Sequence, residues 1–218
     1  MKIVNVFTGL GGGLIDAIAR TYHSILGPNV EIHNIADDSI LSSVIAEGHV
    51  TDNIQKRVDS LYQAAADSGA DLVVCTCSSI GETVANTRIK NVPIIRIDEA
   101  MARVAVATGS RIGVIATLQT TLEPTVRLVE RIAAEQGKPI SCEPVVAGEM
   151  MAFLKAGKMT EALATASTIV RNLASRCDVI ILAQASMAAM QDALQKHSSI
   201  PVYSSPKLCA ESLRKYLS

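Results

Sequence analysis

The sequence predicts an α/β fold of two pseudo-symmetric lobes, each with a parallel sheet, that face each other across a cleft. Short apolar runs rich in β-branched residues alternate with amphipathic segments, which is typical of parallel strands joined by crossover helices. The order of these segments in the first half recurs in the second half, which indicates a duplicated unit. The chain has 218 residues, of which 49% are hydrophobic and 19% charged, so it can bury a core in each half.

The first half contains the segments of one α/β unit. Short apolar runs bounded by turn residues predict buried strands at residues 2–7, 30–35, 72–75 and 94–97. Between them, residues 14–26 and 51–67 have the spacing of amphipathic helices. Thr51 is the expected N-cap of the second helix, and Gly69 lies just past its end. Its expected buried face consists of Ile54, Val58, Leu61, Tyr62 and Ala65.

Three landmarks of the first half recur at nearly constant offsets. They are Lys2 and Arg111 (111 − 2 = 109), Asp71 and Asp178 (178 − 71 = 107), and Pro93 and Pro201 (201 − 93 = 108). Any α/β chain contains similar strands, but agreement within two residues favours an internal duplication. We therefore expect a first lobe of residues 1–97 plus 206–218 and a second lobe of residues 98–205. In such sheets, ligands bind beyond the carboxyl ends of the strands.

Composition and charge argue against nucleic acid and membranes as partners. Lysine and arginine number 20 against 21 aspartates and glutamates, a net charge of −1, so no basic excess is available to neutralise phosphates. Charge-free stretches are far shorter than the roughly 20 residues of a membrane span. Glycines interrupt the apolar run at residues 3–15, which is unlike a signal peptide. We expect a cytoplasmic protein.

The cysteines and histidines show no metal-binding spacing. Five cysteines are an odd number, and the cytosol keeps thiols reduced, so no disulfide framework is expected. No pair of cysteines has the C-x-x-C spacing, and the four histidines lie at unrelated intervals. We therefore expect no structural zinc site.

The offsets place polar residues in equivalent turns of the two halves. Each of these turns follows a strand, where catalytic residues concentrate in this architecture. The equivalent pairs are Thr8 and Thr117, Cys77 and Gln184, and Ser79 and Ser186. The turn at residues 76–79 consists entirely of Thr, Cys and Ser, which makes it the strongest candidate site of the first half.

Cys77 is the candidate catalytic residue of that turn. It comes immediately before an expected helix, whose positive end and free backbone N–H groups favour a thiolate. Such a thiolate could serve as a base or as a nucleophile. The alternative is a small buried residue. That is our interpretation of the other cysteines: Cys75, Cys142, Cys177 and Cys209.

Helix capping offers a structural alternative for other polar residues. The segment from Ser79 to Glu82 fits the capping-box pattern, so both residues have an interpretation as helix caps, and Ser79 could serve both purposes. The turn at 117–121 offers hydroxyl and N–H groups suited to a carboxylate, while Thr121 could instead cap a helix that starts near Glu123.

The glycine-rich run at residues 9–14 argues only weakly for a dinucleotide site. Gly9 and Gly11 occupy the first two places of the G-x-G-x-x-G pattern, but Leu14 occupies the third. The run is better interpreted as a flexible turn where a substrate approaches the backbone closely.

These segments resemble the aspartate/glutamate/hydantoin racemase superfamily over nearly the whole chain. The resemblance rests on DLVVCTCSSIGE (71–82), RIGVIATLQTT (111–121), DVIILAQASM (178–187) and the repeated proline. It implies two facing Rossmann-like lobes with pseudo-twofold symmetry, an isomerase that needs no cofactor, and a role in amino-acid metabolism. Because the family often forms dimers or larger assemblies, it also implies a homo-oligomer.

The resemblance also implies roles for individual residues. In the racemases, two cysteines, one per lobe, flank the substrate α-carbon, and one removes the proton while the other returns it to the opposite face. Cys77 matches the first-lobe cysteine. Thr8 falls near an acidic position of glutamate racemases, and we expect it to contact the substrate. The turns that hold the carboxylate match Ser78, Ser79, Thr117, Thr120 and Ser186.

The chain departs from the family pattern at Gln184, which occupies the position of the second-lobe cysteine. A glutamine does not transfer protons, but its amide can hydrogen-bond a substrate carboxylate or an enediolate oxygen. We expect a racemase or epimerase acting on a small amino acid or related carboxylate, with Cys77 and Gln184 as catalytic residues. The alternatives are a single-cysteine decarboxylase, a cis–trans isomerase of a dicarboxylate, and a non-catalytic protein that binds a small carboxylate.

Overall fold

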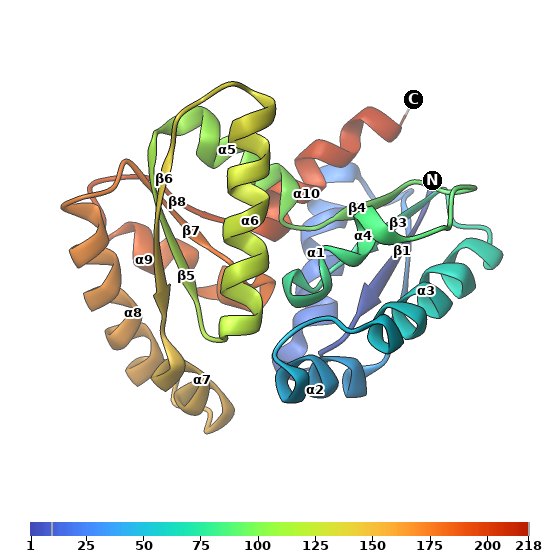
Figure 1. Ribbon diagram of the computed structural model, residues 1–218, viewed down its shortest axis with the longest axis horizontal. Helices are drawn as coiled ribbons and strands as arrows, with labels where there is room; N and C mark the ends of the chain where they lie inside the picture. Colours follow the sequence, from blue (N-terminus) through green and yellow to red (C-terminus); the bar gives the residue numbers. More distant parts are fainter. Residues whose placement is uncertain (10, 218) are drawn as a thin grey trace. The chain divides into compact units, whose positions relative to one another are not determined.

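The computed structural model describes residues 1–9 and 11–217 and has the expected α/β architecture (Figure 1). Within these residues, the strands form two four-stranded parallel sheets. The chain divides into two compact units. The first unit consists of Met1–Glu99 and Pro206–Ser218, and the second unit consists of Ala100–Ser205.

The first unit has a sheet of strand order β2-β1-β3-β4. Its strands are β1 (Lys2–Phe7), β2 (Glu31–Ala36), β3 (Leu72–Cys75) and β4 (Ile94–Arg96). Its helices are α1 (Leu14–Leu26), α2 (Asp38–Glu47), α3 (Asp52–Asp67) and α4 (Thr83–Asn86), with short 3₁₀ turns at Gly11–Gly13 and Ser78–Ile80. Figure 1 shows α1 and α3 on opposite sides of this sheet.

The second unit has the same strand order, β6-β5-β7-β8. Its strands are β5 (Arg111–Ala116), β6 (Ser141–Val146), β7 (Val179–Leu182) and β8 (Val202–Ser204). Its helices are α6 (Gln119–Glu135), α7 (Gly148–Lys155), α8 (Met159–Ala174) and α9 (Gln191–Gln195), with a 3₁₀ segment at Ala185–Met190. The helices α5 (Glu99–Thr108) and α10 (Ser205–Leu213) begin at the boundaries between the units, and a last 3₁₀ turn spans Arg214–Tyr216.

The two sheets share one pairing register, which confirms the internal repeat. In the first sheet, Ile3 of β1 lies opposite Leu72 of β3. In the second sheet, Ile112 of β5 lies opposite Val179 of β7. The differences, 112 − 3 = 109 and 179 − 72 = 107, equal two of the offsets found in the sequence.

An aspartate joins the first and third strands in each unit. The carboxylate of Asp71, before β3, accepts a hydrogen bond of 2.7 Å from the backbone N–H of Lys2. In the second unit, Asp178 accepts from the N–H groups of Ser110 at 3.0 Å and Arg111 at 2.8 Å. The guanidinium of Arg111 also donates to this carboxylate at 2.7 Å. The repeated Asp of the sequence therefore holds the start of one strand to its neighbour.

The first unit buries the helix face that the sequence predicts. The residues of α3 that are at most 2% exposed are Ile54, Val58, Tyr62 and Ala65, and Leu61 is partly buried. They pack against Val4 and Val6 of β1 and Val73 and Cys75 of β3 in one apolar cluster. This core fixes the strand ends that carry the polar residues of the first unit.

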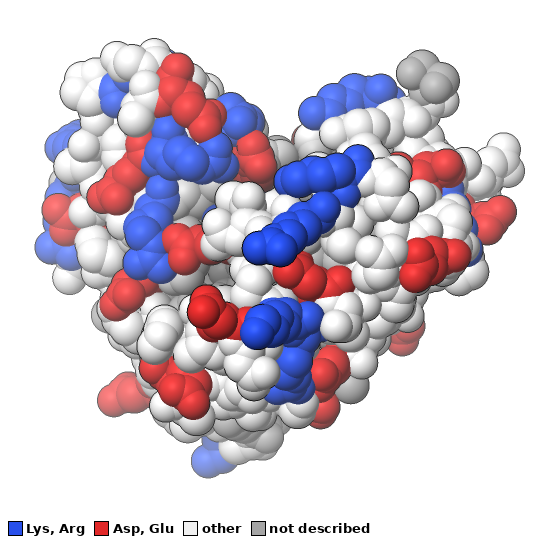
Figure 2. All heavy atoms as spheres, turned by 45° about the vertical axis from the view of Figure 1, so that its right-hand side comes forward, with Lys and Arg blue, Asp and Glu red and all other residues white. Residues whose placement is uncertain are grey.

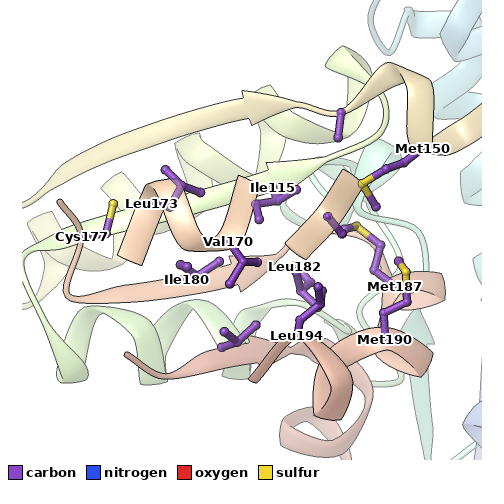
Figure 3. Close-up of a cluster of buried hydrophobic side chains, with 13 residues drawn as sticks. Ile115, Met150, Val170, Leu173, Cys177, Ile180, Leu182, Met187, Met190 and Leu194 are labelled. Carbon is purple, nitrogen blue, oxygen red and sulfur yellow. The ribbon is translucent and has the colours of Figure 1, made fainter. Parts of the chain in front are cut away.

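The second unit has a comparable core, shown in Figure 3. Its cluster extends from Cys177 and Leu173 at one end to Met187 and Met190 at the other. Met187 and Met190 belong to the 3₁₀ segment that directly follows Gln184, and both are at most 3% exposed. Burial of these two methionines anchors the turn that carries Gln184.

The structure adds elements that the sequence analysis does not identify. Helix α2 begins after Asp37, whose carboxylate accepts from the N–H of Ser39 at 3.1 Å. It ends at Glu47 and is followed by Gly48, where φ is 75°. These are ordinary helix start and stop signals. Strand β2 is shifted by one residue from its expected position at 30–35.

The surface carries both signs of charge. Figure 2 shows Lys and Arg side chains interspersed with Asp and Glu over the face in view, as the near-zero net charge suggests. Among the described residues, no helix is both long enough and apolar enough to cross a membrane.

Replacing Thr51 with alanine should lower the free energy of unfolding by about 1 kcal/mol, because an N-cap side chain is lost. The Thr51 hydroxyl accepts from the N–H of Ile54 at 3.3 Å, which confirms its expected capping role. Urea unfolding followed by circular dichroism measures the change. Thr51→Ser keeps the cap and should restore wild-type stability, whereas equal losses in both variants would contradict the capping role.

Replacing Asp178 with asparagine should destabilise the protein at neutral pH and matter less in acid. Hydrogen bonds from Arg111 hold the pKa of Asp178 well below its ordinary value of 3.8. A lowered pKa in the folded state stabilises the protein above the unfolded-state value, and this contribution disappears as the pH falls through the folded-state value.

Thermal unfolding midpoints of the wild type and Asp178→Asn, compared at neutral and acid pH, test this. The gap between them should shrink in acid. Asp67, which is exposed and forms no ion pair with a described residue, provides the control variant Asp67→Asn. A gap that is independent of pH would contradict the role of the ionised carboxylate.

Candidate active site

The first candidate turn lies at the carboxyl end of the first sheet. β1 pairs with β3 so that Val6 lies opposite Cys75, and continuing this register by two residues sets Thr8 beside Cys77. Thr8 is only 1% exposed, and its hydroxyl has no hydrogen-bond partner among the described residues. Cys77 is partly exposed and packs against the apolar cluster of the first unit, whereas Ser78 and Ser79 are buried.

Hydrogen bonds to the backbone carbonyls of Cys77 and Ser78 stabilise the turn that contains them. The N–H of Ile80 donates to the carbonyl of Cys77 at 3.2 Å, and the N–H of Gly81 donates to the carbonyl of Ser78 at 3.1 Å. The thiol of Cys75 donates to the carbonyl of Cys77 at 3.6 Å. Burial raises the pKa of Cys75 to about 12, so this thiol stays protonated at neutral pH and remains a donor.

The expected capping box at Ser79 and Glu82 is wrong. Ser79 lies inside the 3₁₀ turn Ser78–Ile80, and α4 begins at Thr83 with Glu82 in the N-cap position. Cys77 does precede a helical segment, as expected, but that segment is one short turn.

In the second unit, Thr117 and Gln184 meet at the equivalent sheet edge. β5 pairs with β7 so that Ile115 lies opposite Leu182, which sets Thr117 beside Gln184 two residues further on. The Oε1 atom of Gln184 accepts from the backbone N–H of Thr117 at 2.7 Å and from its hydroxyl at 2.8 Å. A backbone N–H can only donate, so these contacts fix which end of the amide is the oxygen. The Nε2 group of Gln184 therefore points away from Thr117 with its two donors.

The other predicted residues of the second unit differ in exposure. Thr117 is 3% exposed, Thr120 is partly buried, and Ser186 is exposed. The hydroxyl of Thr120 is buried and has no hydrogen-bond partner among the described residues. The expectation that Thr121 caps a helix near Glu123 is wrong, because α6 begins at Gln119 with Leu118 in the cap position.

The glycine-rich run forms a 3₁₀ turn, Gly11–Gly13, at the start of α1. Gly13 has φ of 68°, a left-handed conformation that favours glycine. Leu10 of this run lies outside the described residues. Gly9 follows Thr8 directly and is partly buried.

Burial makes the remaining cysteines poor nucleophiles. It raises the pKa of Cys142 to about 11 and that of Cys209 to about 12, and it also raises the pKa of Cys177. The thiol of Cys209 lies 3.4 Å from the buried hydroxyl of Tyr22. Among the described residues, no group of three or more His, Cys, Asp and Glu side chains is arranged to hold a metal ion.

A buried ion pair that the sequence patterns do not predict lies against the Cys77 turn. Arg96, the last residue of β4, and Asp98 are at most 7% exposed. Burial alone would lower the pKa of Arg96, but the charge and hydrogen bonds of Asp98 raise it above its ordinary value. Opposite charges two residues apart at a strand end lie on the same side of the chain, and that spacing was the available signal.

The chain matches the model of one protein family and resembles many solved structures. A model of the family described as Asp/Glu/Hydantoin racemase matches residues 14–213. No curated protein sequence matches the chain.

Solved structures of racemases resemble the whole chain. Aspartate racemase from Picrophilus torridus superimposes with a TM-score of 0.74 at 14% identity, covering 100% of this chain and 94% of that one. Allantoin racemase from Klebsiella pneumoniae gives 0.67 at 18% identity, covering 100% and 87%. A glutamate racemase isoform from Bacillus anthracis gives 0.74 at 16% identity, covering 99% and 80%. At these identities, the likeness establishes the fold.

Cys77 should be alkylated faster than the other four cysteines near neutral pH. Cys77 is partly exposed just beyond a strand, whereas burial raises the pKa values of the other four thiols and lowers their reactivity. Brief iodoacetamide treatment followed by peptide mass spectrometry ranks the five sites. Cys77→Ser should remove most of the early label, and earlier labelling of Cys142 or Cys177 would refute the assignment.

Proposed function

The chain belongs to the Asp/Glu/hydantoin racemase family, and on that basis we propose that it transfers a proton at a carbon beside a carboxylate. It is a racemase-type isomerase, and its substrate in this proposal is a small amino acid or related carboxylate. Cys77 serves as the base or nucleophile. The proposal rests on the occurrence of Cys77 in the first unit and Gln184 at the equivalent position of the second unit, each two residues beyond a paired strand.

Gln184 acts in this proposal as a hydrogen-bond donor. Its Oε1 is occupied by Thr117, so the group left to meet a substrate is the N–H₂ end. A neutral amide neither removes nor returns a proton at neutral pH. Two donors held in place can instead stabilise the negative charge that develops on an enediolate or carboxylate oxygen.

Hydroxyl groups just beyond β1 and in the first turn of α6 complete the proposed substrate site. The buried hydroxyls of Thr8 and Thr120 have no hydrogen-bond partner among the described residues, and such groups are costly unless a ligand or water meets them. We assign them to oxygen atoms of the substrate. The turns that contain Ser78, Ser79, Thr117 and Ser186 hold the carboxylate in the same proposal.

One thiol implies one-base chemistry. The Cys77 thiolate takes the proton from the carbon, the electron pair moves into the carboxylate as an enediolate, and the Gln184 N–H groups stabilise it. The proton then returns from the Cys77 thiol, or from solvent to the opposite face. Because Gln184 replaces a second thiol, a single-cysteine decarboxylase or a cis–trans isomerase of a dicarboxylate is the second candidate.

Solvent-deuterium exchange tests the proposal. The protein is incubated in D₂O with amino acids, hydantoins and C4 dicarboxylates, and proton NMR follows the hydrogen on the carbon beside the carbonyl group. We expect exchange with at least one of these acids and none with Cys77→Ala. Exchange without inversion identifies one-base chemistry. Tight binding of an acid without any exchange would contradict the proposed proton transfer and would indicate a protein that only binds carboxylates.

Loss of Cys77 should be far more damaging than loss of Gln184. Gln184→Ala should lower the exchange rate by about 10²–10³, the usual effect of removing one oxyanion donor. Cys77→Ala should reduce it to background, because no other group takes the proton. Gln63, which is exposed on α3, supplies the matched control Gln63→Ala. Equal and complete losses in both site variants would instead place Gln184 in the proton transfer itself.

A further inference from the structure

A buried arginine lies directly against the turn that carries Cys77. The Nε and Nη2 atoms of Arg96 donate to the two carboxylate oxygens of Asp98, each at 2.9 Å. The two side chains are 8% and 1% exposed. A two-point pair of this kind holds the planar guanidinium in one orientation.

The guanidinium occupies space that only a glycine leaves open. A Cβ atom at position 81 would lie 2.5 Å from Cζ and 2.6 Å from Nε of Arg96, far inside contact distance. Gly81 closes the turn, because its N–H donates to the carbonyl of Ser78, the residue after Cys77. Arg96 therefore packs against Gly81, the last residue of the turn that begins at Cys77.

The second unit lacks both the arginine and the glycine at the equivalent positions. Cys75 lies opposite Arg96 in the first sheet, and Leu182 lies opposite Ser204 in the second. Ser204 hydrogen-bonds the side chain of Gln191. The residue equivalent to Gly81 is Ala188, 107 positions further along, which carries the Cβ that Gly81 lacks. The arginine and the glycine thus occur together, in the unit that has the thiol.

We infer that Arg96 is a positioning residue that fixes the Cys77–Gly81 turn. Asp98 holds the guanidinium of Arg96 in place, and the guanidinium packs against Gly81. The inference rests on the proposed role of Cys77 and adds the group that sets its placement. Removing the fit lets the turn open locally, so the thiol and the hydroxyls of Ser78 and Ser79 spend less time in the reactive arrangement, while Thr8 lies outside this turn.

Hydrogen exchange of the turn amides measures this directly in the full-length protein. The variants are Arg96→Lys, which keeps the charge but loses the planar fork, and Gly81→Ala, which keeps both charges but displaces the guanidinium. Arg57→Lys is the control, because Arg57 pairs with Asp37 at 2.8 Å in the same unit and is 32% exposed. Mass spectrometry of peptides covering residues 76–84 gives the exchange rates.

We expect at least about tenfold faster exchange at Ile80 and Gly81 in both test variants, confined to this turn. In the solvent-deuterium assay, kcat/KM should fall in both test variants, because Cys77, Ser78 and Ser79 all belong to this turn, and Arg57→Lys should not change it. Unchanged exchange in the turn, or an increase spread over the whole unit, would overturn the inference. Because amide exchange needs no substrate, this result is separate from any failure of the chemistry assigned to Cys77.

Discussion

In each unit, the pairing of the first strand with the third decides where the polar chemistry lies. Parallel strands end at the same sheet edge, so the residues just beyond β1 and β3, and beyond β5 and β7, become neighbours. Asp71 and Asp178 hold the other ends of these strand pairs through backbone N–H groups. With both ends fixed and the strands buried, a thiol and an amide appear at equivalent positions of a duplicated frame.

The two copies of the frame have diverged where function is expected. The first unit combines Cys77 with the Arg96–Asp98 pair and a glycine that admits the guanidinium. The second unit combines Gln184 with Thr117, whose two donors turn the amide so that its N–H₂ end is presented. In the proposed function, the first unit supplies the proton transfer and the second unit supplies the charge stabilisation.

Sequence patterns predict most of this frame, because strands and helices depend on local periodicity. The bounds of β1 and α1 and the Thr51 cap follow from nearby residues, and the 107 and 109 residue offsets follow from comparing the two halves of the sequence. The exact start of a helix depends also on how the turn before it packs against distant residues. The two wrong predictions, the caps at Ser79 and Thr121, both concern helix starts. The pattern at Ser79 suits a cap, but the chain forms a 3₁₀ turn there and the helix begins only at Thr83. The role of Arg96 itself depends on a residue fifteen positions away.

A crystal structure with succinate bound would test most directly whether the thiol and the amide serve one substrate. We expect a carboxylate oxygen of succinate within hydrogen-bond distance of Nε2 of Gln184, and the Sγ atom of Cys77 facing the carbon beside that carboxylate. Hydroxyls of Thr8 or Thr120 should meet the remaining oxygens. Succinate held by only one of the two turns, or a Cys77 thiol directed away from the ligand, would contradict this arrangement.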